Sequence, residues 1–268
     1  MKKLSVFAVA FAAMVLASCG GGNKNNQANE EADSVKSFEQ AQVEAGIKMH
    51  IDSLASALGQ MKQLPFMKEG DGSVELTAEE KQVKPDYLIN PSSAEDVASL
   101  AEKYRLLSVL GVDKRIAKLY EMPTDEYEKA ISKLVAEIND PSFKAIQNAS
   151  SIYETTEQLY DAMEENGRIN YFWQLAAASL VEELFVANQN TEKFLASFTD
   201  EIAANSTFRV VLILDALDRL SEFDADIQPV IEALRPLQVL NATTVDELRS
   251  QLAEAKDKIN FARNALVK

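Results

Sequence analysis

Two segments in the second half of the chain are apolar on nearly every side of a helix. They cover residues 171–187 (YFWQLAAASLVEELFVA) and 208–220 (FRVVLILDALDRL). A helix that is hydrophobic on all sides is buried on all sides. Both segments fall short of the roughly 18 uninterrupted apolar residues of a membrane span. We therefore predict that they are the innermost helices of a globular body, around which the other helices pack.

Most of the remaining chain repeats apolar residues at intervals of three and four, which predicts amphipathic helices. The first such stripe ends near residue 64. Ser93 is the expected N-cap of a helix that stops at Gly111. Further helices are expected over 113–121, 124–138, 141–167, 191–202, 224–234 and 244–266. The chain is thus predicted to be an all-α protein of about eight or nine helices, arranged as a single multi-helix bundle or as stacked helical hairpins.

The segment 65–91 interrupts the helical pattern and is predicted to be a long loop. It contains Pro65, Gly70, Gly72, Pro85 and Pro91. Loops of this length are uncommon inside compact domains and are usually functional or disordered. Its later part is apolar enough to pack on the body. Tyr87 and Leu88 are therefore candidate binding residues, and a packed connector is the alternative.

One possible core ion pair follows from the two central helices. Glu183 and Arg209 both project toward the faces that we expect to be buried. An isolated buried charge costs several kcal/mol, so a charge in such a place needs a partner. We predict that Glu183 and Arg209 meet in or beside the core, in a role that fixes packing.

The inventory of reactive side chains excludes several classes of enzyme. His50 is the only histidine and Cys19 the only cysteine, which excludes two-histidine metal sites and cysteine clusters within one chain. The glycines form no nucleotide-binding motif. Carboxylates are abundant, but no pair has the spacing of a glycosidase site. We expect no catalytic residue, no metal and no cofactor, and hence no enzymatic activity; a hydrolase that uses scattered carboxylates is the less favoured alternative.

The N-terminus has the organisation of an export signal. Lys2 and Lys3 precede an apolar run over residues 4–15, which is too short to span a bilayer. The following Leu16-Ala17-Ser18-Cys19 resembles the lipobox of bacterial lipoproteins, in which the cysteine is acylated and the preceding peptide removed. The resemblance implies a signal peptide over 1–18, a flexible tether over 19–37 that begins at lipidated Cys19, and a helical domain over 38–268.

Beyond this motif, the acidic helical body resembles the Bacteroidetes-type lipoproteins of unknown function. Gly20 follows the cysteine in place of the aspartate that marks inner-membrane retention in enterobacteria, which implies an outer-membrane location. Acidic residues that accompany surface export begin only at Glu30, and this favours the periplasmic face.

Charge restricts the partners further. The chain has a formal net charge of −15, and loss of residues 1–18 removes two lysines and no acid, which leaves −17. Such a balance argues against nucleic acid as a partner. The leading expectation is a lipid-anchored envelope protein that binds or scaffolds an unknown protein or envelope component. The alternative is a small-ligand binder for a glycan or a lipid.

Overall fold

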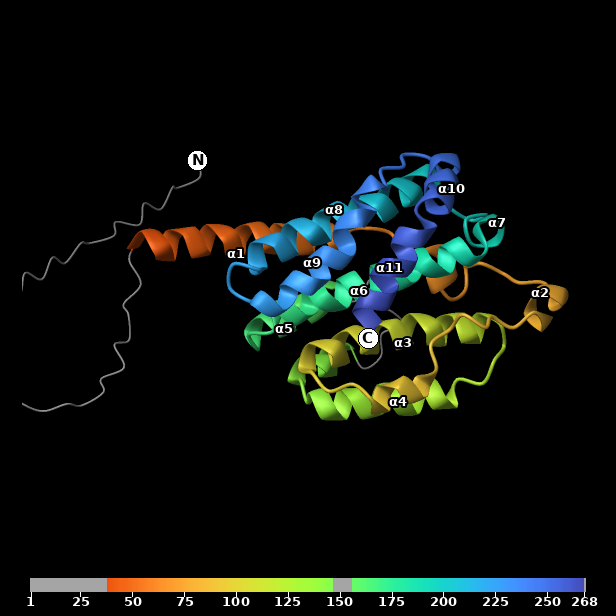
Figure 1. Ribbon diagram of the computed structural model, residues 1–268, viewed down its shortest axis with the longest axis horizontal. Helices are drawn as coiled ribbons and strands as arrows, with labels where there is room; N and C mark the ends of the chain where they lie inside the picture. Colours follow the sequence, from red (N-terminus) through yellow and green to blue (C-terminus); the bar gives the residue numbers. More distant parts are fainter. Residues whose placement is uncertain (1–37, 147–155, 268) are drawn as a thin grey trace, which may run out of the picture.

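Helix α6 (Ile169–Gln189) is the centre of the fold, with residues 172–187 all buried. In the computed structural model, which describes residues 38–146 and 156–267, α6 packs against α3 (Leu100–Leu119), α5 (Thr156–Glu165), α8 (Asp200–Leu220), α9 (Gln228–Leu234) and α11 (Lys256–Val267). The uniformly apolar sequence of α6 explains why it has neighbours on every side. Figure 1 shows the hairpin of α3 and α4 (Asp125–Ile138) on one side of α6, and α1, α8 and α9 on the other.

The protein is all α, as predicted. Eleven α-helices lie within the described residues, nine of them with seven or more residues, and no strand is found there. The helices not yet given are α1 (Phe38–Gly59), α2 (Ala78–Gln82), α7 (Thr191–Phe194) and α10 (Val245–Glu254). Short 3-10 segments also occur, at Pro65–Met67 (η1), Pro91–Glu95 (η2), Pro141–Ile146 (η3), Ala225–Ile227 (η5) and Arg235–Val239 (η6).

The start and the length of α3 differ from the sequence-based expectation. Ser99, not Ser93, caps the helix, and it forms a capping box with Glu102. Gly111 does not end the helix, which continues to Leu119 as one element. The apolar spacing resumes after Gly111 with buried Val112 and Ile116. Burial of this face therefore outweighs the roughly 1 kcal/mol that a glycine costs inside a helix.

Three other predicted helices are divided in the structure. The expected helix 191–202 ends at Phe194 as α7, and Ile202 already belongs to α8. The expected helix 244–266 bends at Ala255 into α10 and α11. Because of the bend, α10 packs on α8 while α11 reaches α3, α6 and α9. The expected helix 141–167 consists of η3 and α5 in its described parts, and the rest of it lies outside the described residues.

The connector over residues 65–91 contains η1, α2 and the start of η2, and parts of it pack on the body. Phe66 and Met67 are buried, and Tyr87, Leu88 and Ile89 are half-buried against the core. The core extends from Ile51 to Leu266, so a chain that starts at residue 20 retains all of it. Within the described part, no helix has both the length and the apolarity that a membrane span requires.

Candidate functional site: a cavity between helices α3, α4 and α6

A cavity with a volume of about 1520 Å³ lies between α3, α4 and α6. Small-molecule sites typically occupy roughly 300–1,000 Å³, so this space is large enough for a ligand with a long apolar portion. Residues at one end come from η1 and those at the other from η3 and α5. The apolar lining residues include Leu107, Val112, Ile131, Val135, Phe143, Leu159 and Leu175.

The helices around the cavity have a fixed register. Tyr104 of α3 stacks on Tyr171 of α6 with ring centroids 4.5 Å apart. One turn later the Ser108 hydroxyl donates a hydrogen bond of 2.9 Å to the Leu175 carbonyl. Helices α3 and α6 therefore run in the same direction with a constant offset. By this register Ser179 lies level with Val112, one turn further along the cavity.

Gly111 lies on the cavity side of α3, in the middle of the helix. A Cβ atom placed on it would meet no other atom within 4 Å. Neither close packing nor an unusual backbone angle therefore accounts for a glycine here. What the missing side chain does is leave the middle of the cavity open.

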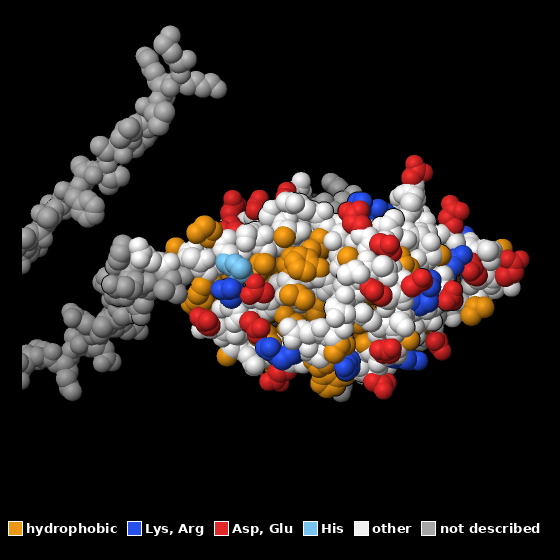
Figure 2. Space-filling model, turned by 90° about the horizontal axis from the view of Figure 1, so that it is seen from above, with side chains coloured by type: hydrophobic (Ala, Val, Ile, Leu, Met, Phe, Trp, Pro, Cys, Tyr) orange, Lys and Arg blue, Asp and Glu red, His pale blue; other side chains and the backbone are white. Residues whose placement is uncertain are grey.

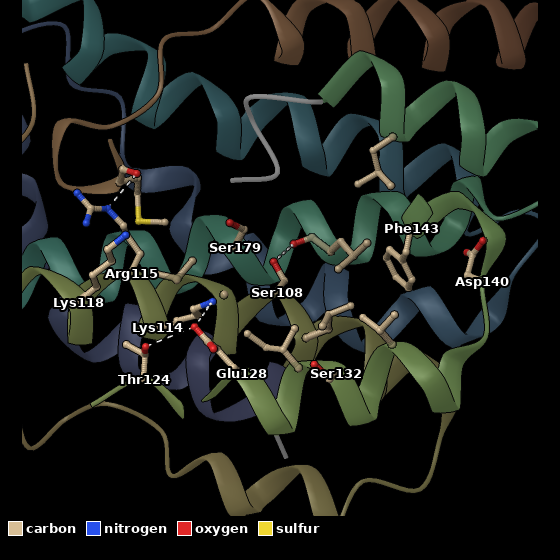
Figure 3. Close-up of a pocket in the computed structure, with 18 of the residues that line it drawn as sticks. Ser108, Lys114, Arg115, Lys118, Thr124, Glu128, Ser132, Asp140, Phe143 and Ser179 are labelled. Carbon is tan, nitrogen blue, oxygen red and sulfur yellow. Dashed lines mark hydrogen bonds and ion pairs between the residues drawn. The ribbon is translucent and has the colours of Figure 1, made fainter. Parts of the chain in front are cut away.

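One end of the cavity is rich in ion pairs. Figure 3 shows Lys114, Arg115 and Lys118 at that end, and Asp140 and Phe143 at the other. Lys114 pairs with Glu128 at 3.0 Å and Lys118 with Glu69 at 2.8 Å.

Arg115 is half-buried and donates hydrogen bonds to the carbonyls of Met67 and Lys68. Burial lowers the pKa of its guanidinium, and Glu69 opposes that effect. The cations at this end are therefore largely matched by carboxylates and carbonyls of the protein.

The α6 side of the cavity carries two polar side chains one turn apart, Ser179 and Glu183. Ser179 is 2% exposed and Glu183 is 0% exposed. Figure 3 shows Ser179 with Ser108 between the two ends of the cavity. Within the described chain, Glu183 Oε1 has no hydrogen-bond partner. The α6 side of the cavity therefore has an unsatisfied acceptor, Glu183 Oε1, beside the hydroxyl of Ser179.

The structure brings the predicted pair Glu183 and Arg209 together in the core. Arg209 Nη1 lies 3.4 Å from Glu183 Oε2, and both side chains are fully buried. Arg209 Nη2 also donates to the Lys62 carbonyl at 2.7 Å. Burial raises the pKa of Glu183 to about 7, although the charge of Arg209 opposes the rise.

A second buried cluster holds the connector against the body. Arg263 of α11 donates to both carboxylate oxygens of Glu182, at 2.7 and 2.8 Å, and to the Tyr87 carbonyl at 3.0 Å. Asp113 of α3 accepts a hydrogen bond of 2.7 Å from the Ile89 amide. Both carboxylates are fully buried.

Burial raises the pKa of Asp113 well above its usual range, and the nearby charge of Glu182 adds to the rise. Tyr87, a candidate binding residue from the sequence, is thus held by its backbone at this cluster. Its ring packs edge-on against Phe185, with centroids 5.9 Å apart. Leu88 is half-buried against the core. Tyr87 and Leu88 do not line the large cavity.

Sequence reasoning missed Asp113, Glu182 and Arg263 as a cluster, because they are separated by 69 and 81 residues. The all-round apolar segment 171–187 contained one usable signal, since a second acid beside Glu183 also needs a partner there.

Cys19 lies outside the described residues. His50 contacts Asp215 at 2.6 Å on a half-exposed surface. Within the described chain, no group of three or more metal-ligating side chains is found.

The fold and the cavity define the class of this protein as an all-α domain with a large cavity between α3, α4 and α6. Comparison with family models, with curated proteins and with solved structures finds no match for the chain.

Proposed function

We propose that this protein is a non-enzymatic, lipid-anchored envelope protein that binds a small, mainly apolar ligand between α3, α4 and α6. The observation that carries the proposal is the cavity of about 1520 Å³, with apolar side chains along its length and a few buried polar groups. Such sites bind drug-sized or lipid-sized molecules, because apolar contact supplies affinity and isolated polar groups set orientation.

The alternative of a scaffold for another protein has less support. Seven large apolar side chains of the described part are at least 45% exposed, and they are distributed over several elements. Of these, Phe208 and Val211 are neighbours on one face of α8. The face drawn in Figure 2 carries apolar groups in several separate places, with charged and polar surface between them. A docking surface normally presents a continuous apolar patch of several hundred Å².

Anchoring through lipidated Cys19 is part of the proposal and rests on the lipobox. A tether over residues 19–37 places the domain near a membrane, with the periplasmic face of the outer membrane favoured. A binder of apolar molecules in that position has direct access to lipids of the same membrane.

The test uses the chain from residue 20 onward, which retains the whole described core. The probes are 1-decanol, decyl methyl ether, decanoate and decylamine, each titrated while the melting temperature is measured. A ligand that binds only the folded state stabilises it by RT ln(1 + [L]/Kd), so the melting temperature keeps rising with the logarithm of the ligand concentration above Kd. We expect a rise of this form with at least one probe. No rise with any of the four would overturn the proposed function.

A further inference from the structure

Glu183 and Ser179 form a matched acceptor and donor at the α6 side of the cavity. Glu183 Oε1 is buried and has no hydrogen-bond partner within the described chain. An unmade hydrogen bond of this kind destabilises the folded protein, and more so for a charged group. The Ser179 hydroxyl lies one turn away on the same face of α6 and is able to donate or accept.

The two neighbouring polar groups do not fill this role. The Ser108 hydroxyl is committed to the Leu175 carbonyl. Arg209 approaches the other oxygen of Glu183, Oε2, and already supplies a positive charge at the carboxylate. A cationic ligand at Oε1 would place a second buried cation beside Arg209, and an anionic ligand would face the carboxylate itself. The group that fits is uncharged and both donates and accepts a hydrogen bond.

We propose that the ligand is an uncharged lipid-like molecule with a hydroxyl group, whose O–H donates to Glu183 Oε1 while its oxygen accepts from Ser179. This inference rests on the proposed function and names the ligand class for that same cavity. The hydroxyl of the ligand lies at the α6 side of the cavity, and the apolar chain of the ligand runs toward Phe143. Tyr104 lies level with Tyr171 and contacts Phe143 at 5.7 Å between ring centroids.

The length of the apolar chain follows from the helix register. Tyr171 and Ser179 are eight residues apart on α6, which corresponds to about 12 Å along the helix. An extended chain of roughly ten carbons spans this distance. A ten-carbon alcohol is therefore the simplest probe of the site.

The experiment compares calorimetric affinities of the same four ten-carbon probes at pH 8. We expect 1-decanol to bind about tenfold or more tightly than decyl methyl ether, which lacks the donor, and more tightly than decanoate or decylamine. Equal binding of alcohol and ether, or tighter binding of decanoate or decylamine, would overturn the inference and leave the proposed function standing. No binding of any probe would instead overturn the proposed function.

Matched variants locate the effect. Ser179→Ala is expected to weaken the binding of 1-decanol about fivefold or more. Ser108→Ala is expected to leave the affinity within twofold, because the Ser108 hydroxyl is already bonded to the Leu175 carbonyl. In Glu183→Gln, Arg209 holds the amide oxygen and the amide nitrogen takes the place of Oε1, so the preference for alcohol over ether disappears. Should Glu183→Gln fail to fold, the affinities of Ser179→Ala and Ser108→Ala and the wild-type affinity ratio of 1-decanol to decyl methyl ether still test the inference. Equal effects of the two serine variants would contradict the assignment.

Discussion

Arg263 holds Glu182 through two hydrogen bonds of 2.7 and 2.8 Å, although the two residues are 81 positions apart in the chain. The same guanidinium lies 3.8 Å from the ring centroid of Phe185 and donates to the Tyr87 carbonyl. One side chain of α11 therefore joins α6 to the connector that precedes α3. The connector is held by specific contacts and not by apolar packing alone.

Replacing Arg263 is expected to destabilise the protein strongly. Arg263→Ala leaves the carboxylate of Glu182 buried without its cation, and removal of one partner of a buried pair costs about 3–5 kcal/mol. Denaturant unfolding measures this loss, and limited proteolysis is expected to cut first within residues 83–90. Arg249→Ala is the control, because its partners Asp246 and Glu192 are highly exposed. A loss for Arg263→Ala no larger than that of the control would contradict this assignment.

Asp113→Asn is expected to stabilise the protein increasingly as the pH rises. The raised pKa of Asp113 means that the folded protein retains a proton that the unfolded chain releases. The contribution of Asp113 to the free energy of unfolding is therefore greatest below the pKa of the unfolded chain, and it is lost as the pH rises toward the pKa of the folded protein. Asparagine at this position can still accept the hydrogen bond from the Ile89 amide, and its contribution to stability does not depend on pH. Unfolding curves of both proteins between pH 4 and pH 8 test this, and a constant difference would refute it.

Glu183 is expected to produce a pH dependence of the same sign. Its pKa is about 7 in the folded protein and its ordinary value is 4.5. Stability from this group is full below pH 4.5 and is lost as the pH rises toward 7, by about 3 kcal/mol. The free energy of unfolding of Glu183→Gln minus that of wild type should rise by this amount over the same interval. A difference that stays flat or falls would show that Arg209 keeps Glu183 ionised.

Acylation of Cys19 is tested by metabolic labelling with an alkyne fatty acid in the native host. We expect the label on wild-type protein and its loss in Cys19→Ser, because the thiol is the acceptor that the lipobox implies. Ser18→Ala keeps a small residue before the cysteine and is expected to remain labelled. Label that persists in Cys19→Ser would exclude this cysteine as the anchor.

Local sequence patterns predicted the fold class and the buried centre of the protein. Segment 171–187 was identifiable because its apolar residues surround the helix, and the charges on two such segments indicated that Glu183 and Arg209 would meet. Helix ends were harder to predict, since Ser93 and Ser99 both have an acid three residues later and only tertiary packing decides between them. The cavity itself was not predictable, because it depends on how three helices are spaced.

Gly111 has a further consequence for stability. Alanine at this position gains about 1 kcal/mol of helix propensity, and its Cβ meets no neighbour within 4 Å. Gly111→Ala is therefore expected to raise the melting temperature. An unchanged or lower melting temperature would indicate that the space beside Gly111 is already occupied.

The most direct test of ligand binding in this cavity is the affinity of 1-decanol for Gly111→Phe and Gly111→Ala, measured by titration calorimetry. The phenylalanine ring projects into the open space beside α3, whereas alanine leaves most of that space free. We predict that Gly111→Phe folds and loses binding by at least tenfold, while Gly111→Ala binds as wild type does. Undiminished binding to folded Gly111→Phe would place the ligand elsewhere and contradict the central claim.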